Sequence, residues 1–152
     1  MQRTHLAHRV GCHTRHDDLE GAGRLNETEG ETMASDFETR CRATISAYMD
    51  AFNGKDLDAL GRTLTDDVTL VDWDVSASGR AEVLATTGRI VSGASLRITV
   101  RDILVSEPSA AADIVISIEG TGELEVIDLF RFAPDGRIRS VRAFRGPLHA
   151  GA

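Results

Sequence analysis

The stretch LEVIDLFRFAPDGRIRSVRAFR, residues 124–145, contains two runs of alternating apolar and polar residues separated by Pro134-Asp135-Gly136. Every second side chain of a strand lies on the same face of its sheet, and Pro, Asp and Gly are residues that turns favour. The stretch therefore predicts two strands, Leu124 to Phe132 and Arg137 to Arg145, joined by a tight turn.

The same alternation predicts two more strands upstream. The first is separated from the second by a break at Glu107-Pro108-Ser109, and Gly120-Thr121-Gly122 predicts the turn that leads into Leu124. Their alternating apolar residues are Leu96, Ile98, Val100, Ile114, Ile116 and Ile118. Strands joined by such short turns favour antiparallel pairing.

The first half of the chain has helical periodicity instead. Ser35-Asp36-Phe37-Glu38 is a capping box that predicts the start of a helix, and Gly54 predicts its end. Asp56 is expected to cap a short second helix, and a third is predicted from about Gly79 to Ile90. The expected inward residues are Phe37, Cys41, Ile45, Tyr48, Met49 and Phe52 in the first helix and Leu57, Leu60 and Leu64 in the second.

Between the second and third helices, Thr65-Asp66-Asp67 predicts a turn and Val68 to Val75 predicts a strand. The expected order is helix, helix, strand, helix, then four strands. Helices segregated from a hairpin-connected antiparallel sheet define the α+β class, in which the sheet curls around the helices.

Composition excludes several classes of function. The 152 residues, of which 41% are hydrophobic, suit one domain with a core. A net charge of −7 argues against a nucleic-acid partner. No apolar run approaches the roughly 20 residues of a membrane-spanning helix. Cys12 and Cys41 have no zinc-ligand spacing and cannot form a disulfide framework. We therefore expect a soluble, cytoplasmic protein with neither nucleic-acid nor membrane partners.

Residues 1–32 differ from the rest, because their aliphatic residues are scattered and no period of 2 or 3.6 is sustained. We expect a disordered extension there and one domain over residues 33–152, with Met33 as an alternative translation start. The extension contains potential metal ligands, His5, His8, Cys12, His13 and His16. Nothing preorganises them, so we favour a flexible polar tail over a metal site.

Three polar side chains occupy positions that are expected to face inward. Asp128 shares a strand face with Leu124, Val126, Phe130 and Phe132, and a carboxyl group buried in such a row is either paired with a cation or protonated. Arg131 lies on the opposite face and is no easy partner.

Asp72 follows Val68 and Leu70 on one face of its strand, and Tyr48 lies on the inward face of the first helix. Each residue alone has an ordinary interpretation: a core Tyr with its hydroxyl at the rim, a solvated or capping Asp at a strand end, and a buried acid that ties loops together. Trp73, adjacent to Asp72, is expected on the opposite face. The functional interpretation depends on the combination of Tyr48, Asp72 and Asp128.

The segments AYMDAFNGKDLDAL around Tyr48, LTDDVTLVDW around Asp72 and VIDLFRFAPDGRIRSVRAFRG around Asp128 resemble the NTF2-like superfamily, SnoaL-like proteins included, and within it the bacterial ketosteroid isomerases. The resemblance covers roughly residues 37–146. It implies a cone in which three N-terminal helices pack in a curved, mostly antiparallel sheet around a pocket, and it implies a homodimer.

The resemblance also implies roles. Asp72 would be the general base that moves a proton between carbons beside a carbonyl group, and Tyr48 and protonated Asp128 would donate hydrogen bonds to the dienolate oxygen. The substrate would be a small hydrophobic, polyketide-like or steroid-like molecule, and no cofactor or metal is implied. The expected substrate pocket comprises Val68, Leu70, Ile114, Ile116, Phe130, Val141 and Arg145.

Some positions depart from the steroid isomerases. Short deletions fall around residues 76–79 and 120–123, and Thr86 and Thr87 replace aromatic residues. Arg145 stands where a bulky aromatic residue lines the pocket. If Arg145 points inward, the substrate is expected to carry a carboxylate or another polar oxygen; if a bulge turns it outward, it is a solvated charge.

Two other functions stay open. The first is a different enzyme on the same fold: a polyketide cyclase, for which His149 is the domain's sole histidine, or an epoxide-opening enzyme that uses Asp72 and Asp128 with Arg97 or Arg101. The second is a binding or dimerising module without catalysis, because fold does not determine chemistry.

Overall fold

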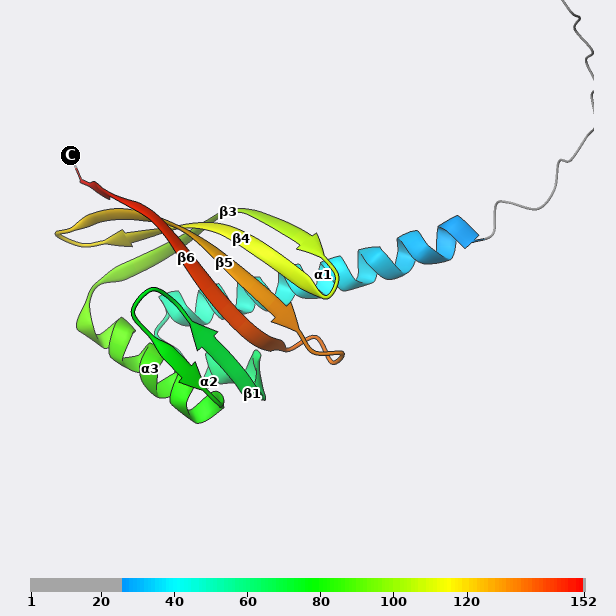
Figure 1. The fold of residues 1–152 in the computed structure, drawn as a ribbon, viewed down its shortest axis with the longest axis horizontal. Coiled ribbons are helices and arrows are strands. Elements are labelled where there is room, and N and C mark those ends of the chain that lie inside the picture. Colours follow the sequence, from blue (N-terminus) through cyan, green and yellow to red (C-terminus); the bar gives the residue numbers. More distant parts are fainter. Residues whose placement is uncertain (1–25, 152) are drawn as a thin grey trace, which may run out of the picture.

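The computed structural model describes residues 26–151 of the chain, with side chains from residue 36 onward. Within this range, three helices lie against one face of a curved sheet of six strands (Figure 1). The elements are α1 (Asn26–Asn53), α2 (Leu57–Arg62), β1 (Leu64–Val71), β2 (Ser76–Ser78), α3 (Arg80–Gly93), β3 (Leu96–Ser106), β4 (Ser109–Ile118), β5 (Gly122–Phe132) and β6 (Ile138–Ala150). The expected α+β class is confirmed.

The strands are ordered β2-β1-β6-β5-β4-β3 across the sheet. The strands β3 to β6 pair as consecutive antiparallel neighbours, as the turn signals predict. β6 also pairs in parallel with β1, so the sheet is mixed. This pairing places Val71, the last residue of β1 before Asp72, beside Arg142 of β6.

Helix α1 confirms the expected inward face but not the expected start. Cys41, Ile45, Tyr48 and Met49 are all buried. The helix begins at Asn26, so the capping box at residues 35–38 lies inside it, and residues 26–32 are helical where a disordered extension was expected. The capping pattern is a local signal, and it does not prevent helix from continuing upstream. The five potential metal ligands of residues 1–25 lie outside the described residues.

The segment between α2 and α3 differs from the prediction. Asp56 caps α2 as expected, because its side chain accepts a hydrogen bond from the Ala59 N–H. Residues 65–67 belong to β1 and form no turn, and β1 ends at Val71. A sixth strand, β2, follows after an irregular segment and pairs antiparallel with β1. Two adjacent exposed carboxylates, Asp66 and Asp67, resemble a turn in sequence, but they face solvent from a strand that shifts its register against β6.

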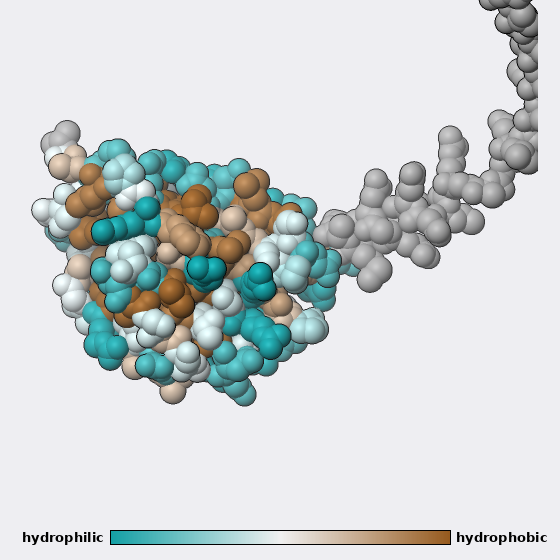
Figure 2. Space-filling view, viewed as in Figure 1, coloured by the Kyte–Doolittle hydropathy of each residue, from teal (hydrophilic) through white to brown (hydrophobic). Residues whose placement is uncertain are grey.

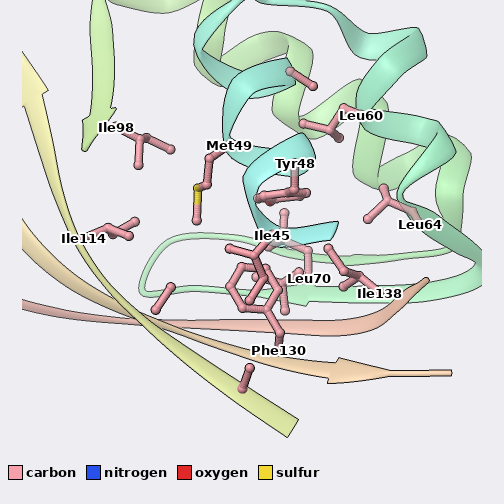
Figure 3. Packing of buried hydrophobic residues seen from close by; sticks show 14 of the residues in the cluster. Ile45, Tyr48, Met49, Leu60, Leu64, Leu70, Ile98, Ile114, Phe130 and Ile138 are labelled. Atoms are coloured by element: carbon pink, nitrogen blue, oxygen red, sulfur yellow. The ribbon is translucent and has the colours of Figure 1, made fainter. Parts of the chain in front are cut away.

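The core lies between α1 and the sheet. Figure 3 shows Ile45, Tyr48 and Met49 on α1 directed toward the side chains of the sheet, with the ring of Phe130 beside them. Ile45 and Phe130 are completely buried. Removing such side chains from water supplies about 1.5–3 kcal/mol each, so the contact between α1 and the sheet contributes strongly to stability.

Asn53, the last residue of α1, fastens the helix to β3. Its side-chain amide donates to the Ile98 carbonyl oxygen at 2.9 Å, and its Oδ1 accepts from the Ile98 N–H at 2.7 Å. β3 is an edge strand, and Asn53 supplies the pairing that a neighbouring strand would otherwise give. The end of the helix that carries Tyr48 is thereby held at a fixed distance from the sheet.

The outer face of the sheet carries exposed apolar side chains. Ile127 of β5 and Phe144 of β6 are cross-strand partners, 42% and 49% exposed. Figure 2 shows apolar surface among polar residues on this side, where the strands lie in front of α1. We name Ile127 and Phe144 the outer-face pair.

In the described part of the chain, no helix is both long and apolar enough to cross a membrane. Within the same residues, no three His, Cys, Asp or Glu side chains are grouped so that they could hold a metal ion.

Candidate functional site

A cavity of about 270 Å³ lies between the helices and the inner face of the sheet, and Tyr48, Asp72 and Asp128 all line it. These three residues come from α1, from the segment after β1 and from the middle of β5. The cavity is therefore built where sequence segments far apart in the chain converge. Its lining comprises Tyr48, Phe52, Leu70, Asp72, Trp73, Asp74, Val75, Thr87, Ile90, Leu96, Ile98, Ile114, Ile116, Ile118, Leu124, Val126, Asp128, Val141 and Ala143.

Asp128 occupies the buried position that strand alternation predicts. It is 7% exposed, and its partners on the neighbouring strands are the small residues Ala112 of β4 and Ala143 of β6. Burial, and secondly the negative charge of Asp72, raise the pKa of Asp128 to about 7. A large fraction of Asp128 is thus protonated at neutral pH, and a protonated carboxyl group is a hydrogen-bond donor.

Tyr48 approaches the cavity from α1. Its ring packs edge-on against Phe130 with a centroid distance of 5.6 Å, which fixes the direction of the hydroxyl. Burial raises the pKa of Tyr48 far above its usual value, and the charges of Asp128 and Asp72 raise it further. The phenol therefore keeps its proton and remains a donor.

Asp72 is held differently. It lies just after the end of β1, in the irregular segment 72–75, and its Oδ1 accepts hydrogen bonds from the backbone N–H groups of Asp74 and Val75, both at 2.7 Å. Its own N–H donates to the Val75 carbonyl oxygen at 2.9 Å. Among the described residues Oδ2 has no such donor, so one carboxylate oxygen is fixed and the other can accept a proton.

These groups form an asymmetric set. One carboxyl group is buried and partly protonated at neutral pH, a phenol that lines the same cavity stays protonated, and a second carboxyl group at intermediate burial accepts hydrogen bonds from two N–H donors. Tyr48 and Asp128 can each donate a hydrogen bond into the cavity, and Asp72 can accept a proton there. The two carboxyl groups have different environments, which would allow one of them to donate a proton or hydrogen bond while the other acts as a base.

The structure places four of the seven expected pocket residues in the lining: Leu70, Ile114, Ile116 and Val141. Val68 and Phe130 do not line the cavity, because they are completely buried in the core that supports it. Their alternation correctly indicates the inner face, but it does not distinguish a side chain at the cavity from one packed behind it.

Arg145 does not line the cavity, although it is among the expected pocket residues; of the two directions that the sequence leaves open, the structure supports the exposed one. Arg145 is exposed, and its guanidinium lies over the ring of Trp73, 5.6 Å from the ring centroid. Arg145 pairs with Val126 just before β6 shifts its register against β5. Its backbone position is therefore opposite an inward-facing residue. Trp73 lines the cavity, and Arg145 does not.

Trp73 corrects a second expectation. Alternation along a strand would turn it away from Asp72, yet both side chains line the cavity. The reason is that β1 ends at Val71, so alternation does not apply to residues 72–75. Thr87 of α3 also lines the cavity. The helical pattern around it is weak and gives no signal for its direction, and only the resemblance to the steroid isomerases singles out this position.

The residues considered for the alternative enzymes lie elsewhere. Arg101 is exposed on the sheet and pairs with Asp113 and Glu125 at 2.7 and 2.8 Å. His149 lies near Glu125, at 3.6 Å, and Arg97 is exposed on β3. None of these three side chains lines the cavity.

Comparisons with known proteins agree with this architecture. The model of the SnoaL-like domain matches residues 45–141, a range that contains Tyr48, Asp72 and Asp128. No curated protein sequence matches the chain.

Three solved structures illustrate the range of similar proteins. An NTF2-like protein of unknown function from Cytophaga hutchinsonii is 14% identical, with a TM-score of 0.61 over 70% of this chain and 90% of its own. A proposed ketosteroid isomerase from Kribbella flavida is 22% identical, with a TM-score of 0.65 over 75% and 83%. The epoxide hydrolase/cyclase-like enzyme SalBIII, of pyran ring formation in salinomycin, is 21% identical, with a TM-score of 0.63 over 72% and 92%.

At these identities the solved structures establish the NTF2-like fold and leave the reaction open. The family model covers most of the domain and includes the residues from which the cavity is built. The chain belongs to the SnoaL-like domain family.

Proposed function

We propose that this protein is an isomerase that moves a carbon–carbon double bond into conjugation with a carbonyl group through a dienolate, as ketosteroid isomerases do. The observation that carries the proposal is the convergence of Tyr48, Asp72 and Asp128 on one largely apolar cavity.

The proposed reaction has two proton transfers. The carboxylate of Asp72 removes a proton from the carbon between the carbonyl group and the double bond, and the electron pair moves onto the carbonyl oxygen. Tyr48 and protonated Asp128 donate hydrogen bonds to that oxygen. Protonated Asp72 then returns the proton to the far carbon of the former double bond, and the carbonyl group re-forms. Nothing is oxidised or reduced, and the protein is regenerated.

The environment suits this chemistry because a carbon acid is weak. The site must stabilise the negative charge on oxygen with donors that are already in place, and such donors act more strongly where water is excluded. Tyr48 is 5% exposed and Asp128 is 7% exposed, so both donors are in a dry part of the site. Asp72, with one oxygen free, provides the base.

A β,γ-unsaturated cyclic ketone tests the proposal directly. Incubation with the protein is expected to raise the ultraviolet absorbance of the conjugated enone above the rate in buffer. An unchanged rate over a range of such ketones would contradict the proposal.

Tyr48→Phe is expected to slow this reaction on the order of a hundredfold, since removing one donor to a developing oxyanion typically costs about 10²–10³ in kcat. The ring and its contact with Phe130 remain, so the fold is preserved. The measurement is kcat, with unfolding by urea as the check on stability. A variant as fast as the wild type would exclude Tyr48 as a donor.

Epoxide opening is the second candidate, because two carboxyl groups in one cavity could activate water and protonate an epoxide oxygen. The fold of SalBIII supports this alternative. No arginine is among the described residues that line the cavity, which is why we rank it second. Formation of a diol from a cyclic epoxide, with no conversion of enones, would reverse the order. A catalytically silent binding module would bind ligands and convert neither.

We also propose that the protein forms a homodimer through the outer face of its sheet. The exposed outer-face pair, Ile127 and Phe144, offers apolar area that a second copy could cover. Phe144→Asp is expected to shift sedimentation at micromolar concentration from dimer to monomer, because the substitution removes the apolar ring from the contact and replaces it with a carboxyl group that is costly to desolvate. A wild-type protein that sediments as a monomer would contradict the proposal.

A further inference from the structure

The cavity also restricts which molecules can react in it. Resting on the function proposed above, we infer that the substrate is a compact, uncharged carbonyl compound of one or two rings, and that neither steroids nor carboxylate-bearing ketones are substrates. The inference rests on the volume of the cavity, on the chemistry of its lining and on the charges at its polar end.

Volume sets the first limit. A cavity of about 150 Å³ with an aliphatic and aromatic lining can hold one benzene ring. The cavity of about 270 Å³ therefore corresponds to one or two rings. A steroid skeleton is much longer, and to place its carbonyl oxygen between Tyr48 and Asp128 it would have to extend out of the cavity into water. The rings outside the cavity would gain none of the apolar burial that the lining gives to a smaller molecule.

The lining sets the second limit. Away from the polar groups it consists mainly of aliphatic side chains from the inner faces of β3, β4 and β5, among them Ile98, Ile114 and Ile116. Thr87 supplies the one further hydroxyl group. Such a surface binds a hydrocarbon ring and gives a charged substituent no partner.

Charge sets the third limit. Asp72, Asp74 and Asp128 line the cavity, and no Lys, Arg or His does so among the described residues. Arg145, which lies over the ring of Trp73, stays outside this lining. A carboxylate on the substrate would meet carboxyl groups at the polar end and an apolar surface elsewhere. An uncharged ketone is neither repelled by the carboxyl groups nor forced to bury a charge against the apolar surface.

In the sequence, Arg145 indicates a substrate with a carboxylate or another polar oxygen only if its side chain points into the pocket. In the structure its guanidinium is occupied with the face of Trp73, where cation–π attraction supports the wall of the cavity. Arg145 therefore supports a residue of the cavity wall, and it gives no reason to expect a carboxylate on the substrate.

The inference can be tested by binding alone, with phenols that mimic the dienolate. Isothermal titration calorimetry compares para-hydroxybenzoate with its methyl ester, a pair of nearly equal size that differs in charge. We expect the ester to bind at least about tenfold more tightly. The same measurement compares naphthol with a phenolic steroid, and we expect naphthol to bind at least about tenfold more tightly. Equal or reversed affinities in either pair would overturn the inference, as would the absence of binding by all four phenols.

Asp74→Asn tests the electrostatic cause. Asp74 is exposed, and its backbone N–H, which Asp72 uses, is unchanged by the substitution. The preference for the ester over the carboxylate is expected to narrow several-fold, because one repelling charge is gone. If the ratio of the two affinities stays the same, repulsion by Asp74 is excluded as a cause of the preference for the ester.

The outcome is separable from the reaction proposed above. Calorimetry measures which molecules the cavity accepts, whereas the absorbance of the conjugated enone measures turnover. If the ester and naphthol bind more tightly as expected but no enone is converted, the proposed reaction is wrong and the inferred ligand class is still supported.

Discussion

Asp72→Asn is expected to reduce the isomerisation rate by about 10²- to 10⁴-fold, the range by which a positioned general base accelerates proton transfer. An amide cannot take the proton from carbon, so the first step loses its acceptor. The substitution preserves what the Asp72 side chain does for the fold: the amide oxygen can still accept from the N–H groups of Asp74 and Val75. The decrease should therefore appear in kcat without a matching loss of stability.

The measurement is the initial rate of conjugated-enone formation, with binding of naphthol measured alongside. Asp67→Asn is the matched control, because Asp67 is an exposed carboxylate of β1 that does not line the cavity. It should convert the enone at the wild-type rate. If Asp72→Asn retained wild-type kcat, the proton would have to be removed by another group, and the proposed mechanism would be wrong.

The buried donors could be predicted from sequence because regular elements carry them. Asp128 lies in the middle of an eleven-residue strand, where the period of two determines its face without ambiguity. Tyr48 lies on a long helix whose inward residues recur at the helical period. In both cases a single polar group within an apolar row is a signal that a sequence carries by itself.

The rest of the site is formed where regular structure stops, and there the sequence is a poorer guide. Asp72 and Trp73 both face the cavity because β1 ends one residue before them, which an alternation argument cannot detect. Arg145 lies at a register shift of β6, and its side chain is placed by contact with Trp73, which comes from a remote part of the sequence. The size of the cavity likewise depends on tertiary packing and on no local pattern.

Asp128 is also expected to control how stability depends on pH. Its pKa is about 7 in the folded protein and near the ordinary 3.8 when unfolded. Between these values the folded state holds a proton that the unfolded state has lost. Raising the pH therefore favours unfolding, and the contribution that is fully present below pH 4 is lost as the pH rises through 7. The expected loss is about 4 kcal/mol, a large share of the 5–15 kcal/mol of a typical domain.

Urea unfolding at a series of pH values from 4 to 8 measures this loss, and Asp128→Asn identifies its source. The amide does not titrate, so the difference in unfolding free energy between wild type and variant should shift in favour of the variant as the pH rises. Asp135→Asn is the control, since Asp135 is an exposed acid and the Arg137 backbone N–H and guanidinium lower its pKa. The difference in unfolding free energy between Asp135→Asn and the wild type should not change over the pH range in which Asp128 loses its proton.

The rate of the enone reaction gives an independent readout of the same proton. Above pH 7 the wild type loses the hydrogen bond that Asp128 donates, because the carboxyl group ionises, and kcat should fall as the pH rises further. Asp128→Asn, which keeps an N–H donor at every pH, should be slower below pH 7 and should show no such fall. A wild-type stability that does not change between pH 4 and 8 would mean that Asp128 is already ionised when folded. Asp128 could then donate no hydrogen bond, and stabilisation of a dienolate at this site would lose one of its two donors.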